Sequence, residues 1–231
     1  LKLSQRDNTF NFGGVGMSQK ASQSYDDLDD FSPPTLFEKL EIQFDHPEHF
    51  MKSFARDVVN TQAEFEWEFK VDAELNEATT LNWENQDFGE NTNELYLLDV
   101  SRHIIIDMRL QNQYSFDPSK SSAFKIYFGQ DLKSKVKPEG IFLGEAFPNP
   151  SSRLVNIPFT VSGSEYYQVR LEVYDMTGRK VTTLLDKELK AGFYSTIWDV
   201  DQTGIVNGLY AYRLMVRTNG KSETYTNRVI I

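Results

Sequence analysis

The feature that most constrains the fold is an alternation of apolar and polar side chains with a period of two residues. Residues 65–72 read Phe-Glu-Trp-Glu-Phe-Lys-Val-Asp, and residues 40–45 read Leu-Glu-Ile-Gln-Phe-Asp. Successive side chains of a β-strand point to opposite faces of a sheet, so this pattern is typical of an antiparallel strand with one buried face. The sequence therefore predicts half-buried sheets.

Further short strands are predicted on both sides of a polar, lysine-rich stretch at residues 131–140 (DLKSKVKPEG). Before this stretch, the candidates are 79–83, 94–100, 104–109, 113–116 and 123–128. After it, they are 154–161, 168–174, 180–185, 193–199, 208–217 and 222–231. Short strands separated by turn residues predict an all-β chain with two consecutive antiparallel β-sandwich domains of the immunoglobulin-like class.

The N-terminal segment has a different composition. Residues 1–35 are poor in aliphatic side chains and rich in Gly, Ser, Gln, Asn and Asp. Such a segment buries too little apolar area to offset its chain entropy. We therefore expect an extended arm or linker at 1–35, a sandwich at 36–130, a linker at 131–140 and a second sandwich at 141–231.

Charge and composition exclude several classes of function. The chain has 231 residues, no cysteine, and 24 basic against 34 acidic side chains, for a net charge of −10. Nucleic-acid binding needs a basic footprint, and disulfides or thiolate metal sites need cysteine. The apolar runs are only a few residues long, whereas a membrane-spanning helix needs about 20. The charge is uneven, because residues 1–140 carry 14 basic and 25 acidic side chains and residues 141–231 carry 10 and 9.

Several groupings of polar residues invite a metal site or a catalytic site, and each lacks a required element. His46 and His49 are three residues apart with a proline between them, whereas the metalloprotease motif needs a helical spacing of four. Asp26–Asp30 and Asp199–Gly204 lack the residue order of a calcium loop. The acidic side chains at 64, 66 and 68 alternate on one strand face, which is typical of a solvated face. We expect no catalytic, cofactor-binding or metal-binding residue, no cofactor, and no enzyme within these residues.

Five motifs follow one another in the second unit. They are Phe147-Pro148-Asn149-Pro150, residues 173–181 (VYDMTGRKV), residues 189–194 (LKAGFY) with Trp198-Asp199, residues 207–214 (NGLYAYRL) and residues 227–231 (NRVII). In this order they resemble the C-terminal sorting domain of proteins exported by the type IX secretion system of Bacteroidota and relatives. The same pattern occurs in a related immunoglobulin-like module of flagellar hook-capping proteins. The first unit resembles the β-sandwich that often precedes such sorting domains.

The resemblance implies periplasmic transit, recognition by an outer-membrane secretion translocon and its shuttle proteins, and a location at the cell surface or outside the cell. The final strand would be the part that is recognised. The residues that carry the motif, for partner recognition or for the fold, are Pro148, Asn149, Pro150, Gly178, Gly192, Trp198, Gly208, Tyr210, Arg213, Arg228, Val229, Ile230 and Ile231. Arg228 stands where the family usually has lysine.

The leading hypothesis is a non-catalytic C-terminal region of a secreted or cell-surface bacterial protein, whose last domain directs export. Because the sequence starts at Leu1, with neither Met nor an apolar signal-peptide core, we expect a processed or partial piece of a longer protein. One alternative is a structural subunit of a surface assembly or appendage, which an ordered residue 1–35 arm lying on a neighbouring subunit would favour. The other is a carbohydrate-binding module with a sorting domain, which requires a planar row of exposed aromatic side chains.

Overall fold

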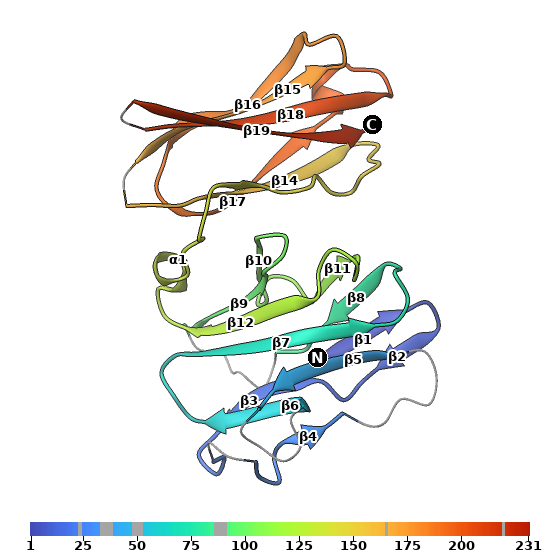
Figure 1. Cartoon of the computed structure of the whole chain (residues 1–231), viewed down its shortest axis with the longest axis vertical. Coiled ribbons are helices and arrows are strands. Elements are labelled where there is room, and N and C mark those ends of the chain that lie inside the picture. Colours follow the sequence, from blue (N-terminus) through green and yellow to red (C-terminus); the bar gives the residue numbers. More distant parts are fainter. Residues whose placement is uncertain (23–24, 33–38, 48–52, 86–91, 165, 219) are drawn as a thin grey trace. The chain divides into compact units, whose positions relative to one another are not determined.

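The chain forms two compact units, Leu1–Leu132 and Lys133–Ile231, which are described here one at a time. The structure is a computed structural model that describes residues 1–22, 25–32, 39–47, 53–85, 92–164, 166–218 and 220–231. Strands dominate both units (Figure 1), and the short helical segments are α1 (Leu132–Lys135) and η2 (Asp201–Thr203). The all-β prediction is confirmed. Within the described ranges, no helix is long and apolar enough to cross a membrane.

The first unit contains two sheets. The smaller sheet has the order β11 (Gln113–Phe116), β8 (Thr79–Asn82), β1 (Lys2–Gln5) and β2 (Asn8–Phe10). The larger sheet has the order β10 (Ile104–Asp107), β9 (Glu94–Asp99), β12 (Ala123–Gly129), β7 (Phe65–Ala73), β5 (Leu40–Asp45), β6 (Ser53–Asn60) and β3 (Gly14–Ser18), with β4 (Asp30–Phe31) also paired to β6. Every pairing is antiparallel except that of β3 with β6, which is parallel.

The alternation in β7 produces the expected burial. Trp67, Phe69 and Val71 are buried, while the charged residues between them are exposed. Phe69 stacks against Phe124 of the neighbouring strand β12, with ring centroids 5.4 Å apart. Trp83 is also buried, so both tryptophans of this unit belong to its core. The core therefore combines aromatic and aliphatic side chains that the period-two pattern directs inward.

The predicted N-terminal arm at 1–35 differs from the structure, because β1, β2 and β3 are integral strands of the first unit. Leu3 is fully buried opposite Leu81, and the Gln5 side chain donates hydrogen bonds to Leu75 O, Glu77 O and Thr79 Oγ1. The segment is poor in apolar residues, but paired strands satisfy its backbone and a few side chains enter an existing core. Composition alone does not report such pairing. Residues 23, 24 and 33–35 of the predicted arm lie outside the described residues.

The predicted linker at 131–140 also has structure of its own. It contains α1, and the side chains of Leu132 and Val136 are buried. The division between the two units falls between Leu132 and Lys133, within this stretch.

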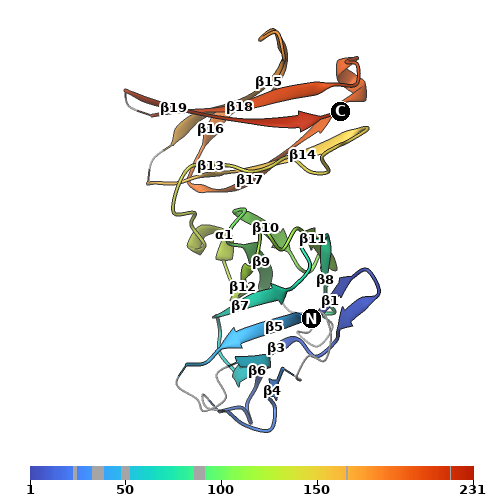
Figure 2. The same cartoon turned by 45° about the vertical axis from the view of Figure 1, so that its right-hand side comes forward.

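The second unit is a seven-stranded sandwich (Figure 2). One sheet has the order β13 (Phe142–Leu143), β14 (Leu154–Val161) and β17 (Gly192–Asp199). The other has the order β16 (Lys180–Leu189), β15 (Tyr167–Asp175), β18 (Leu209–Thr218) and β19 (Lys221–Ile230). The first, second and fifth strands of this unit (β13, β14 and β17) therefore form one sheet, and the third, fourth, sixth and seventh (β15, β16, β18 and β19) form the other. The constant-type immunoglobulin arrangement differs in placing the fourth strand with the first, second and fifth.

Inward side chains of both sheets build a single core in this unit. The sheet of β14 contributes Val155, Ile157 and Phe159, and β15 contributes Val169, Leu171 and Val173. Tyr212, Leu214 and Val216 of β18 complete the opposite layer. Every second residue of these strands is buried as the alternation predicted, and Pro158, Thr160 and Glu172 between them are buried as well.

Candidate recognition surface of the C-terminal unit

The first and last motifs of the second unit meet at the end of the chain. The backbone N–H of Ile230 donates to the Asn149 Oδ1 atom at 3.0 Å, and the Ile230 carbonyl accepts from the Ser151 N–H at 2.9 Å. Pro148 and Pro150 lie on either side of Asn149, and both follow cis peptide bonds. The Pro-Asn-Pro segment therefore caps the backbone of β19 at its last residue, although about eighty residues separate the two motifs in sequence.

The three apolar residues that end the chain do not share one environment. Val229 is fully buried and Ile231 is 8% exposed, and both belong to the sandwich core. Ile230 is 47% exposed, and Arg228 is exposed as well. Only these two side chains of the last four residues are therefore accessible to a partner while the domain stays folded.

Trp198, Tyr210 and Gly208 support the same end of the sandwich. The rings of Trp198 and Tyr210 meet edge to face with centroids 5.8 Å apart, and both are buried. The Tyr210 hydroxyl donates to the Val206 carbonyl at 2.6 Å. Gly208 exchanges two backbone hydrogen bonds with Ile231, at 2.8 and 2.9 Å. These motif residues have a structural role, because they fix the position of the C-terminal strand.

Gly178 closes the turn between β15 and β16. Its φ is +84°, in a region that glycine adopts with little strain, and its N–H donates to the Asp175 carbonyl at 3.0 Å. The Asp175 carboxylate accepts hydrogen bonds from the Thr177 hydroxyl and from the backbone N–H groups of Arg179 and Thr177. These donors, the Thr177 hydroxyl foremost, lower the pKa of Asp175 to about 2.

Gly192 begins β17 in a close approach to an aromatic ring. A Cβ atom at this position would lie 3.4 Å from the ring of Tyr194, at van der Waals contact distance. The Tyr194 hydroxyl donates to the Lys190 carbonyl at 2.8 Å and so closes the turn that leads into β17. Gly192 therefore lies at a turn that Tyr194 closes, beside the ring of that tyrosine.

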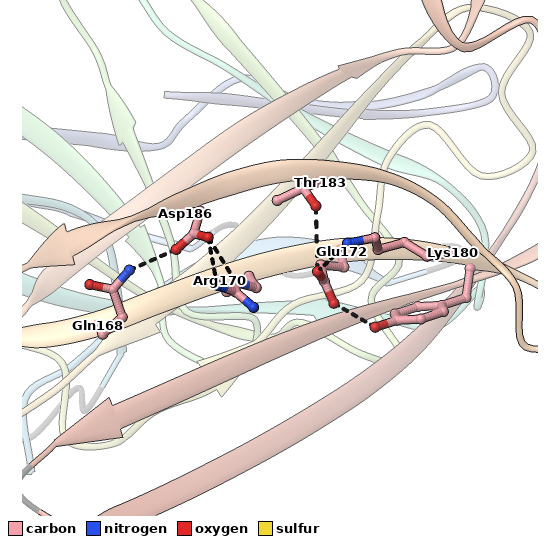
Figure 3. A network of polar contacts seen from close by, with 7 residues as sticks. Gln168, Arg170, Glu172, Lys180, Thr183 and Asp186 are labelled. Atoms are coloured by element: carbon pink, nitrogen blue, oxygen red, sulfur yellow. Dashed lines mark hydrogen bonds and ion pairs between the residues drawn. The ribbon is translucent and has the colours of Figure 1, made fainter.

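A polar network covers the outer surface of β15 and β16 (Figure 3). Arg170 pairs with Asp186 at 2.8 Å, and Gln168 donates to the same carboxylate. The Glu172 carboxylate, which is 5% exposed, accepts from Tyr174 and pairs with Lys180 at 3.2 Å. The hydroxyl of Tyr174, together with Lys180, lowers the pKa of Glu172. Each carboxylate in this network is thus neutralised within it.

Arg213 lies on the same outer surface, one strand further along. Its guanidinium group sits over the Tyr174 ring, 4.7 Å from the centroid. Glu172 is its cross-strand neighbour, but that carboxylate is already bound by Lys180, Tyr174 and Thr183. The Nε atom of Arg213 is buried without a hydrogen-bond partner among the described residues. The motif arginine is therefore held in place by the ring of Tyr174.

Two further motif residues, Tyr212 and Asn227, join the strands at this site. The buried Tyr212 hydroxyl donates to the Gly144 carbonyl and accepts from the Ala146 N–H, both at 2.8 Å. The Asn227 amide donates to the Leu143 carbonyl at 3.2 Å. The alternation in β18 indicated that Tyr212 points inward, but no local pattern predicts a hydrogen-bond partner more than sixty residues away.

Two of the groupings considered for metal binding have partners within the first unit. The Asp26 carboxylate accepts backbone N–H groups of Ser22 and Leu28. His46 lies 3.5 Å from the Asp57 carboxylate, while His49 is outside the described residues. Among the described residues, no group of three or more His, Cys, Asp or Glu side chains could hold a metal ion.

Comparison with known proteins identifies the second unit. Residues 145–231 match the family described as secretion system C-terminal sorting domain, and no curated protein matches the chain. Dimeric latent PorU from Porphyromonas gingivalis is similar over 71% of this chain and 18% of its own, at 16% identity and a TM-score of 0.34. A β-glucuronidase from Parabacteroides merdae is similar over 71% and 27%, at 12% identity and a TM-score of 0.25. One from Lactobacillus rhamnosus is similar over 73% and 36%, at 12% identity and a TM-score of 0.23.

The chain spans between 18% and 36% of the lengths of these solved structures. At such scores the likeness says nothing about activity. The family match is specific to the unit in which the five motifs lie, and it includes the capped end of β19. Residues 145–231 are therefore a type IX secretion C-terminal sorting domain, and the protein that carries them is exported across the outer membrane to the cell surface or the medium.

Proposed function

We propose that residues 141–231 are themselves the export signal, recognised as a folded domain by the outer-membrane translocon and its shuttle proteins. The observation that carries this proposal is the convergence of the first and last motifs on Ile230. The Pro-Asn-Pro segment, Gly208 and the last strand build one end of the sandwich together. A translocon that recognises this end would explain why these residue types are needed at positions so far apart in the sequence.

The burial at the end of β19 favours recognition of a folded domain over recognition of a released tail. Val229 and Ile231 fill the core, and extracting them would expose apolar area worth about 1.5 to 3 kcal/mol for each side chain. Arg228 and Ile230 are accessible without any such cost. We infer that a partner contacts these two side chains and that the buried pair serves to hold them in place.

A secretion assay on the full chain tests this proposal. The chain is fused behind a fluorescent protein with a periplasmic export signal, in a bacterium that has a type IX system. Deletion of Asn227–Ile231 should trap the reporter in the periplasm, because the deletion removes both the exposed and the core residues. Arg228→Glu together with Ile230→Asp should also reduce export while leaving the thermal unfolding midpoint unchanged. Full export of this double variant would contradict recognition through the exposed residues.

We further propose that the first unit, residues 1–132, has no catalytic role and acts as a spacer. The acidic face of β7 supports this proposal, because Lys125 pairs with both Glu66 and Glu68 and Lys70 pairs with Asp45. Asp45 and Glu68 border a cavity of about 230 Å³ that Lys70 and Lys125 also line, so charged groups of opposite sign neutralise one another there. A screen of the purified chain against glycosides, esters and peptides should give no turnover, and saturable hydrolysis of any of these would contradict this role.

No observation specifically favours either alternative function, the carbohydrate-binding module or the structural subunit of a surface assembly. In the described part of the first unit, the exposed aromatic side chains are Phe12 and Tyr25, and Tyr25 stacks on Phe31 at 4.7 Å. Two separate rings do not make the planar row that a sugar-binding surface requires. The N-terminal strands pair within their own unit, so they offer no arm for a neighbouring subunit.

A further inference from the structure

β19 is an edge strand whose outward backbone groups follow from its hydrogen-bond register. Gly208 and Ile231 exchange both backbone bonds, and β18 and β19 pair without any shift from Leu209↔Ile230 to Thr218↔Lys221. In an antiparallel ladder, bonded pairs alternate with non-bonded pairs. The backbone N–H and C=O groups that point away from β18 are therefore those of Ser222, Thr224, Thr226, Arg228 and Ile230.

Only the last of these five residues is capped. Asn149 and Ser151 bind the N–H and C=O of Ile230, whereas no backbone partner is found among the described residues for the other four. The side chains of Ser222, Thr224, Thr226 and Arg228 are all exposed. The open edge, defined here as residues 222–228, therefore presents a row of unpaired donors and acceptors.

The opposite edge of the same sheet, formed by β16, is protected against strand addition, whereas the open edge of β19 is not. The pairing of β15 with edge strand β16 has two register shifts, at Leu171/Glu172 and at Val173/Tyr174. Natural proteins use bulges, prolines and short strands to prevent strand addition at an edge. The open edge has no proline and no bulge, and it belongs to a strand of ten residues. An edge of this kind is a template for another strand.

The sheet surface beside the open edge is cationic. Arg213, Arg217 and Arg228 alternate with the core residues of β18 and β19 and so face outward, and their cross-strand neighbours are Thr226, Ser222 and Ala211. The carboxylates of Glu172, Asp186 and Glu188 lie on β15 and β16, where Lys180 and Arg170 neutralise the first two. Neither Arg217 nor Arg228 has an ion pair in the described chain. An added strand would lie with its side chains next to this basic surface.

We propose that the open edge of β19 binds an extended, acidic segment of a partner protein, which joins the sheet as an additional strand. Main-chain hydrogen bonds to residues 222–228 supply the affinity. The basic side chains of Arg228 and Arg213 favour a partner segment whose carboxylates face them. The Asn149–Ser151 cap stops the added strand before Ile230 and so fixes its register. This inference deepens the proposed function and rests on it for the setting in which the partner is met, but the binding is measurable on the purified chain.

Hydrogen exchange with a defined peptide tests the proposal. The probe is a synthetic peptide in which glutamate alternates with valine, about eight residues long so that it spans the open edge at ~3.3 Å per residue. A matched peptide carries lysine in place of glutamate. With the glutamate peptide, exchange of the Thr224, Thr226 and Arg228 amides should slow at least about tenfold, because these amides gain hydrogen bonds. Protection elsewhere, no protection, or equal protection by the lysine peptide would overturn the proposal.

Two variants at Thr226 distinguish a loss of strand addition from a loss of folding. Thr226→Pro removes an outward N–H that β18 does not use, so the folded sandwich should tolerate it while strand addition is blocked. Thr226→Val keeps that N–H and should bind like the parent chain. If Thr226→Pro fails to fold, Arg217→Glu with Arg228→Glu should still abolish binding of the glutamate peptide and leave the unfolding midpoint in place, because both side chains are exposed. Unchanged binding by folded Thr226→Pro, or by the folded double arginine variant, would overturn the proposal.

The outcome is independent of export. A chain that is not exported in the secretion assay but whose open-edge amides are protected by the glutamate peptide would overturn the proposed function and leave the strand-addition site standing. A chain that is exported but whose open-edge amides gain no protection would overturn the strand-addition site and leave the proposed function standing.

Discussion

Replacing Tyr212 with phenylalanine tests whether one buried hydroxyl ties β18 to the start of the sorting domain. The substitution removes no volume from the ring packing but takes away both 2.8 Å hydrogen bonds, to the Gly144 carbonyl and from the Ala146 N–H. A buried donor left without a partner costs about 1 to 3 kcal/mol. The Gly144 carbonyl retains a long contact with the Asn227 amide at 3.4 Å, so losing the Tyr212 hydroxyl costs less at this carbonyl than at the Ala146 N–H.

Together these losses predict a destabilisation of about 3 kcal/mol for the second unit, on the order of 100-fold in its unfolding equilibrium. Hydrogen exchange of the buried amides of β15 and β18 measures this directly, because it reports the opening of the second unit separately from the first. Tyr210→Phe is the matched control on the same strand, since it removes a single bond to the Val206 carbonyl and should cost about 1 kcal/mol. Equal effects of the two substitutions, or a Tyr212→Phe effect below about 1 kcal/mol, would refute the reasoning.

Three further perturbations follow from the same structure. Leu3→Ala should destabilise the first unit by about 2 to 5 kcal/mol, because Leu3 is fully buried in β1; denaturant unfolding with little change would show that the N-terminal segment is an arm after all. Gly178→Ala should cost about 1 kcal/mol through its φ of +84°, since space around it is open; a thermal midpoint unchanged or raised would contradict this. The pKa of Asp175 in the folded chain is about 2, below its ordinary value of 3.8, so the stability that this carboxylate contributes is complete above pH 3.8 and is lost as the pH falls through 2. Asp175→Asn should remove this part of the pH dependence of the unfolding free energy, measured by acid titration. Identical acid-unfolding profiles of the variant and the parent chain would contradict this.

Much of the fold was predictable from the two-residue period alone. The predicted strand at 154–161 coincides with β14, and that at 222–231 is within one residue of β19 at either end. β16 was predicted to end at residue 185 but continues to Leu189. The missed residues 186–189 read Asp-Lys-Glu-Leu, and three consecutive charged side chains give no apolar alternation from which a strand could be predicted, although these residues pair regularly with β15.

The N-terminal segment and the recognition surface show what the sequence pattern omits. β3 joins the sheet through parallel pairing with β6, and neither strand alone indicates that partner. The motif residues were identified, but their division into core and surface was not. Val229 and Ile231 are buried while Ile230 and Arg228 are exposed, and only the strand register decides which. The contact between Asn149 and Ile230 joins residues that are adjacent only after folding.

The most direct measurement of the central claim is a transfer experiment. The whole second unit, residues 133–231, is placed behind a fluorescent protein with a periplasmic export signal, in a bacterium with a type IX system and in the same strain with its translocon inactivated. We predict that the reporter reaches the surface or the medium only when the translocon is active. A reporter that stays in the periplasm of both strains would contradict the claim that this domain directs export.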